Sequence, residues 1–140
     1  MPASVASTRK KKPMPETEKS TRQDHAAYAV TFTIALAIAL GTLLPNEQLP
    51  DSQTSDKAIH LIAFALLTLP LSFAGAVDKV RLFTVSLCFG AAIELIQPYF
   101  GRSGEWLDFG ADAAGAALGV LGGVVFSQVA KRLGRRSTAD

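Results

Sequence analysis

The stretch GAAIELIQPYFGRSGEWLDFGADAAGAALGVLGG, from Gly90 to Gly123, decides the fold. It holds parts of two apolar segments, which are separated by a short loop that contains Pro98 and two glycines. Extended beyond the stretch, each segment reaches about the 20 residues that a helix rising about 1.5 Å per residue needs to cross a bilayer. The stretch therefore predicts two membrane helices joined by a tight turn.

Two further apolar segments precede this pair. Of the 140 residues, 49% are hydrophobic and 19% are charged, and the apolar residues are concentrated in blocks rather than spread as in a soluble core. The sequence therefore predicts an all-α bundle of four transmembrane helices in a polytopic integral membrane protein. We expect the helices at about residues 26–44, 56–74, 80–97 and 107–130, within a membrane domain of residues 25–130.

Both ends of the chain are polar. Residues 1–24 combine Ser, Thr, Pro and charge without apolar periodicity, which predicts a disordered basic tail, and residues 131–140 form a second basic tail. Twelve of the 14 Lys and Arg residues lie in these tails or around residues 75–81, and only Lys57 and Arg102 lie on the other side. By the positive-inside rule we expect both termini in the cytoplasm and loops 45–55 and 98–106 outside.

Charge and cysteine content exclude other classes. The net charge of +2 is weak, and most basic residues flank apolar segments, so the sequence does not suggest a nucleic-acid partner. Cys88 is the one cysteine, which rules out an internal disulfide.

Polar residues that a membrane helix normally avoids recur at helical spacing in three of the predicted helices. By the rise of about 1.5 Å per residue, His60, Glu94 and Asp112 share one depth, about 5 to 8 Å below the outer interface. A second polar residue in each helix lies on the same face nearer the surface. The candidate binding residues are Asp56, Lys57, His60, Glu94, Gln97, Arg102, Asp108 and Asp112.

Charged side chains in the membrane need partners, because each costs at least about 2.5 kcal/mol at mid-depth. The candidate pairs are Arg102 with Asp108 or Glu94, and Lys57 with Asp112, and the sequence does not decide which of them form. Three glycines recur at every fourth residue of the last helix: Gly115, Gly119 and Gly123. Their face allows another helix to approach closely, within the chain or in a dimer.

These residues occur in a characteristic order: Asp56, Lys57 and His60, then Glu94 and Gln97, then Arg102, Asp108, Asp112, Gly115 and Gly119. The order resembles the VanZ-like membrane proteins, a family named for a teicoplanin-resistance protein, and the resemblance covers about residues 55–125. One difference is Asp112, where many members carry Asn. The resemblance implies a multi-pass protein of the bacterial cytoplasmic membrane and cell envelope, with a link to glycopeptide (teicoplanin) susceptibility through the family's founding member.

Several functions fit the residues themselves. The first is an outer-leaflet polar site that binds a lipid, a lipid-linked cell-wall glycan or a lipoglycopeptide, with Arg102 and Lys57 contacting phosphate. The second is a hydrolase or transferase acting on a lipid-linked substrate, with His60, Glu94 and Asp112 as candidate catalytic groups. The third possibility is a structural bundle whose polar residues satisfy one another without a ligand. Proton-coupled export is less favoured, because the first predicted helix lacks a carboxylate.

A histidine with carboxylates could also hold a divalent metal. The spacings match no metal motif, so the sequence predicts neither a metal nor a cofactor.

Overall fold

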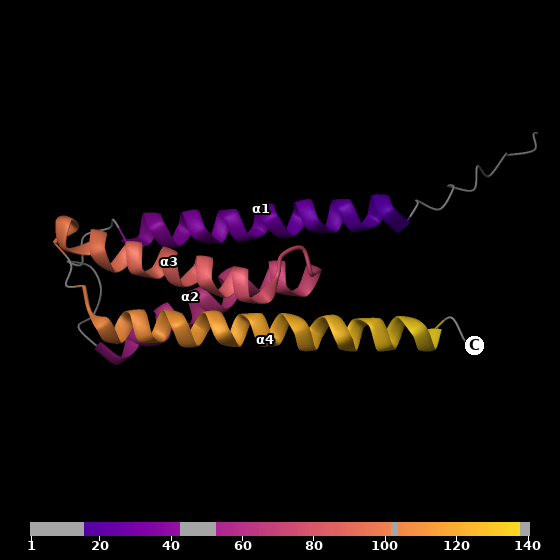
Figure 1. The fold of residues 1–140 in the computed structure, drawn as a ribbon. Helices are drawn as coiled ribbons and strands as arrows, with labels where there is room; N and C mark the ends of the chain where they lie inside the picture. Colours follow the sequence, from indigo (N-terminus) through magenta and orange to yellow (C-terminus); the bar gives the residue numbers. More distant parts are fainter. Residues whose placement is uncertain (1–15, 43–52, 102–103, 138–140) are drawn as a thin grey trace, which may run out of the picture.

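The computed structural model describes residues 16–42, 53–101 and 104–137. Within these ranges the chain forms α-helices α1 (Glu16–Thr42), α2 (Gln53–Ala74), α3 (Lys79–Ile96) and α4 (Trp106–Ser137), and a short 3-10 helix, η2 (Gln97–Phe100), follows α3 directly. The helices lie alongside one another as a bundle (Figure 1). The predicted all-α four-helix bundle is confirmed.

Each of the four long helices is apolar enough to cross a membrane. The apolar segments are Ser20–Gly41, Asp56–Ala74, Lys79–Phe100 and Trp106–Arg135. Large apolar side chains also face outward on every helix, among them Phe32, Ile62, Val80 and Leu121. Such a surface suits lipid, so the chain is a multi-pass membrane protein.

The first and last helices extend further than the sequence predicts. Helix α1 begins at Glu16, so the prediction of a disordered tail over residues 1–24 is wrong for residues 16–24. An exposed salt bridge between Glu18 and Arg22, 3.1 Å long and one turn apart, supports this added segment. Helix α4 continues through the basic segment to Ser137, while residues 1–15 and 138–140 lie outside the described part of the chain.

Helices α2 and α4 form the closest pair in the bundle. Gly115, Gly119 and Gly123 lie against α2, and a Cβ atom on any of them would collide with Leu61, Ala65 or Ser72 respectively. Two hydroxyl groups of α2 donate hydrogen bonds to α4 in the same region. Thr68 Oγ1 donates to the carbonyl of Ala116 at 3.0 Å, and Ser72 Oγ donates to that of Val120 at 2.6 Å. The glycine face thus serves packing within the chain.

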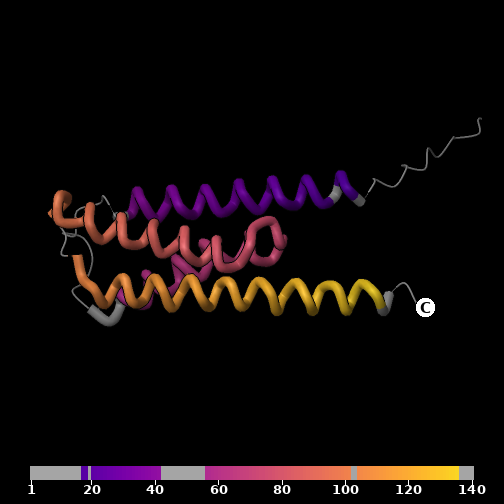
Figure 2. Tube along the Cα trace, in the orientation of Figure 1, coloured from indigo at the N-terminus to yellow at the C-terminus, as the bar shows by residue number. Residues whose placement is uncertain are grey.

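The core draws on all four helices. Phe64 and Leu67 of α2, Ile93 of α3 and Ala116 of α4 form one buried cluster, against which side chains of α1 pack. The tube in Figure 2 shows where the helix ends lie. The C-terminal end of α3 and the N-terminal ends of α2 and α4 share one end of the bundle, which we call the cluster end, and the start of α1 and the end of α4 lie at the other.

Candidate functional site

The centre of the polar cluster is a contact between α2 and α4. Nδ1 of His60 lies 2.9 Å from Oδ1 of Asp112, and the Asp112 side chain is fully buried. Both residues lie close to the N-terminal end of their helix, which brings them to one level at the cluster end. Buried imidazole and carboxylate groups need such partners, because each loses its hydration.

Helix α3 contributes Glu94 to the same level. Its Oε1 atom lies 4.0 Å from Nδ1 of His60, so His60 faces carboxylates from two other helices. Its Oε2 atom accepts a 2.9 Å hydrogen bond from the backbone N–H of Glu105, just before α4. This bond ties the end of α3 to the start of α4 and fixes the direction of the Glu94 carboxylate.

The candidate pair of Lys57 with Asp112 is not the one that forms. Nζ of Lys57 lies 3.1 Å from Oε2 of Glu105 and 3.5 Å from Oδ1 of Asp108, while Asp112 contacts His60 instead. Lys57 begins the turn that precedes His60, so its partners come from the start of α4, one turn before Asp112. The other predicted pairs involve Arg102, which lies outside the described residues.

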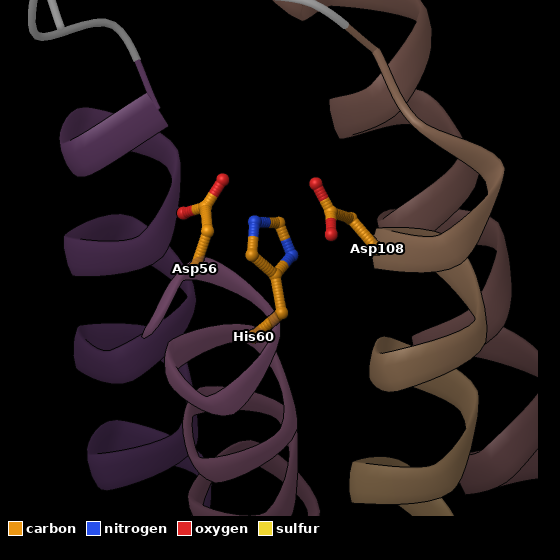
Figure 3. A group of neighbouring side chains, drawn as sticks. All are labelled: Asp56, His60 and Asp108. Carbon is orange, nitrogen blue, oxygen red and sulfur yellow. The ribbon is translucent and has the colours of Figure 1, made fainter. Parts of the chain in front are cut away.

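Asp56 and Asp108 form the outer part of the cluster, together with His60. In Figure 3 the imidazole ring lies between the carboxylates of Asp56 on α2 and Asp108 on α4. Donor atoms of these three residues lie within 4.8 Å of one another. The structure therefore forms two groups that share His60, one with Asp56 and Asp108 and one with Glu94 and Asp112.

Gln97 stands apart from this network. It belongs to η2 rather than to α3, and its side chain is buried. Its Oε1 atom accepts no hydrogen bond from the residues that the structure describes. Its backbone is still α-helical and its N–H donates to the carbonyl of Ile93, so Gln97 follows Glu94 at the helical spacing that the sequence predicts.

Two residues of the site were not identified from the sequence. Glu105 is a partner of both Lys57 and Glu94. The sequence feature that could have identified it is its position just before the first turn of α4, where carboxylates are common. Gly90 provides the space for Asp112, since a Cβ there would lie 2.8 Å from Oδ2. The sequence feature that could have identified Gly90 is its position one turn before Glu94 on α3.

An apolar pocket opens beside the cluster. It has a volume of about 280 Å³ and lies between the end of α3 and the start of α4. Its walls are mostly apolar and include Ala91, Leu95 and Phe109, while Glu94 and Glu105 supply the polar edge. Glu94 therefore belongs both to the pocket and to the polar cluster.

Among the described residues the cluster is acidic. Asp56, Glu94, Glu105, Asp108 and Asp112 bring five carboxyl groups together. Lys57 is the one lysine that pairs with them in the described part of the chain, and its ammonium is shared by two of them. The arrangement suits ligands that donate hydrogen bonds or carry positive charge.

Neither protein-family models, curated proteins nor solved structures give a match to this chain. Any function assigned to the candidate site therefore has to be argued from the geometry of its residues.

Proposed function

We propose that this chain is a VanZ-like protein of the bacterial cytoplasmic membrane, with both termini in the cytoplasm. Its polar cluster then faces the outer leaflet, where it binds the head of an amphiphilic envelope molecule, such as a lipid or a lipid-linked cell-wall glycan. Such binding would influence susceptibility to teicoplanin, which is itself a lipoglycopeptide.

One observation carries this proposal: Glu94 lies on both the apolar pocket and the polar cluster. A lipid-linked molecule has the same division, with a hydrocarbon part beside a polar head. The apolar wall of the pocket suits part of a hydrocarbon chain. Sugar hydroxyls are hydrogen-bond donors and suit the carboxylates beside it.

The first test is direct binding of lipid to the purified full chain. Ala91→Leu narrows the pocket without changing a charged residue, and Ala92→Leu adds the same group at the neighbouring exposed position. Native mass spectrometry of protein titrated with a lipid-linked cell-wall glycan should show binding by the wild type and by Ala92→Leu, and weaker binding by Ala91→Leu. Equal binding by all three would contradict the role of the pocket.

The second test addresses antibiotic susceptibility. A glycopeptide-sensitive host expresses the wild type, Glu94→Gln or the control Glu18→Gln, whose carboxylate lies on α1 far from the cluster. The wild type and the control should reduce teicoplanin susceptibility, and Glu94→Gln should not, at equal membrane abundance. Without a wild-type effect the resistance part of the proposal fails, while the lipid-binding part is judged by the first test.

A second function is favoured by the contact between His60 and Asp112. A histidine held by a buried carboxylate is the arrangement of a general base, which fits a hydrolase or transferase acting on the same class of substrate. Conversion of the lipid-linked glycan by the wild type, lost in His60→Gln, would establish it. Binding without conversion would support the binding role alone.

A further inference from the structure

The three residues at the centre of the cluster have the composition of a metal site. His60 on α2, Glu94 on α3 and Asp112 on α4 present one imidazole nitrogen and two carboxylate oxygens within 4.8 Å of one another. Ligands around a tetrahedral zinc ion lie about 3.3 Å apart, given metal–ligand distances of about 2.0 to 2.1 Å. From Nδ1 of His60, the distances of 2.9 Å to Oδ1 of Asp112 and 4.0 Å to Oε1 of Glu94 lie on either side of this ligand–ligand spacing.

Buried oxygen atoms without donors point to a missing positive partner. Asp112 is fully buried and uses Oδ1 for His60, while its Oδ2 accepts no hydrogen bond from the described residues. Oε1 of Glu94, the atom nearest Nδ1 of His60, is also buried and accepts none from them. A buried carboxylate oxygen left without a partner is costly, so a cation between these groups would stabilise the site.

The charges nearby do not supply that partner. Lys57 pairs with Glu105 and Asp108 at the outer edge of the cluster. No lysine or arginine among the described residues forms a salt bridge with Glu94 or Asp112. Among the described side chains, the charged partner of Glu94 and Asp112 is therefore the imidazole of His60, while the other oxygen of Glu94 accepts a hydrogen bond from the backbone N–H of Glu105.

We propose that His60, Glu94 and Asp112 bind one divalent transition-metal cation. The imidazole nitrogen favours zinc and other late transition metals over magnesium, calcium and manganese, which suit oxygen ligands. The cation takes the place of the proton shared by His60 and Asp112, and its remaining positions are open to water or to a ligand. The proposal does not depend on lipid binding.

The outer triad of Asp56, His60 and Asp108 is the competing site. It is less suited because Asp108 already pairs with Lys57, whose ammonium would repel a cation. Asp56 is also more exposed than the fully buried Asp112. The inner triad, whose Asp112 is fully buried and meets no ammonium group in the described part, is therefore the stronger choice.

The test uses the full chain, purified in a non-ionic detergent and freed of metal by a chelator. Titration with Co²⁺, followed by visible absorption, should show one ion bound per wild-type chain, and Zn²⁺ should displace it. His60→Gln, Glu94→Gln and Asp112→Asn each remove one ligand. Because loss of a residue that only supports a ligand typically costs about 10- to 100-fold in affinity, loss of a direct ligand should cost at least about 100-fold.

Matched controls are available on α1. His25→Gln, Glu18→Gln and Asp24→Asn repeat the three substitutions at positions away from the cluster and should leave Co²⁺ affinity unchanged. Thermal unfolding provides a second measurement, because an ion that binds the folded state raises the melting temperature of the wild type and of the controls but not that of the ligand variants. Circular dichroism verifies that each variant is folded.

The outcomes separate the possibilities. Absence of Co²⁺ binding and of thermal stabilisation in the wild type would overturn the proposal, as would ligand variants that bind as tightly as their controls. Loss of binding in Asp56→Asn but not in Asp112→Asn would assign the ion to the outer triad and overturn the inner site. Metal binding is measured without lipid, so its failure leaves the lipid-binding test unaffected.

Discussion

The carboxylate of Asp112 on α4 fills the space that Gly90 leaves open on α3. A Cβ atom at Gly90 would lie 2.8 Å from Oδ2 of Asp112 and 3.3 Å from Cε1 of Phe64. The position of Asp112 beside His60 therefore depends on a residue that carries no side chain. This relationship connects the packing of α3 on α4 with the geometry of the site.

We predict that Gly90→Ala disturbs the site as well as the fold. The added methyl group pushes Asp112 away from His60, so Co²⁺ affinity should fall at least 10-fold if the proposed metal site is correct, an estimate on the order of a lost supporting contact. Crowding of the core typically costs about 1 to 3 kcal/mol, and the gain of about 1 kcal/mol from replacing a helical glycine by alanine offsets only part of this range. Thermal unfolding measures the stability.

Gly110→Ala is the control for this prediction, since a Cβ there meets nothing within 4 Å. A Gly90→Ala protein as stable as this control would contradict the prediction.

A second prediction concerns the close packing of α2 on α4. Gly119→Ala places a methyl group against the carbonyl of Ala65 and the hydroxyl of Thr68, so the helices must separate. We expect a loss of about 1 to 3 kcal/mol in the free energy of unfolding, measured in detergent. The control Gly134→Ala adds a methyl group in open space near the end of α4 and should be neutral or slightly stabilising. Equal melting temperatures for the two variants would show that the contact tolerates a methyl group.

The fold and part of the site follow from the sequence for physical reasons. Apolar blocks long enough to cross a bilayer determine the number of helices, and a helical rise of about 1.5 Å per residue places His60, Glu94 and Asp112 at one level. Pairing is a different problem, because it depends on the rotation of each helix about its axis. Lys57 and His60 are both close to α4, but only the packed structure shows that Lys57 meets Asp108 and His60 meets Asp112.

Local backbone geometry accounts for other differences. The sequence does not predict the start of α1 at Glu16 because the first turns of this helix are exposed and therefore show no apolar periodicity. The role of Glu105 depends on its backbone N–H, which donates to Glu94, and a sequence pattern of side chains does not reveal such a bond.

A third prediction tests the two hydroxyls that cross between α2 and α4. Thr68→Val and Ser72→Ala each remove a hydrogen bond to a backbone carbonyl of α4, at 3.0 and 2.6 Å. Hydrogen bonds between membrane helices contribute about 0.6 kcal/mol on average and about 1.7 kcal/mol at most, so each variant should lose stability in this range.

Controls for these variants remove a hydroxyl that bonds only within its own helix. Thr33→Val loses a bond to Ala29, and Ser86→Ala, which is buried like Ser72, loses a bond to Leu82. These controls should change the free energy of unfolding less than Thr68→Val and Ser72→Ala do. If the pairs behave alike, the bonds between helices contribute no more than those within a helix.

The last prediction concerns the ammonium of Lys57, which lies between Glu105 and Asp108. Lys57→Met leaves these carboxylates facing each other without a positive charge, so we expect lower stability than in the wild type. Glu105→Gln in the same chain should restore part of the lost stability, because it removes one of the two repelling carboxylates.

Since Lys57 is partly exposed, the loss of stability in Lys57→Met should become smaller between 0.1 and 1 M salt, over which the screening length falls from about 10 to about 3 Å. Thermal unfolding in a non-ionic detergent measures each variant, and Arg22→Met, which removes an exposed pair with Glu18, is the control with little expected change. A Lys57→Met protein as stable as this control, or a double variant less stable than Lys57→Met alone, would show that Lys57 does not hold the two carboxylates together.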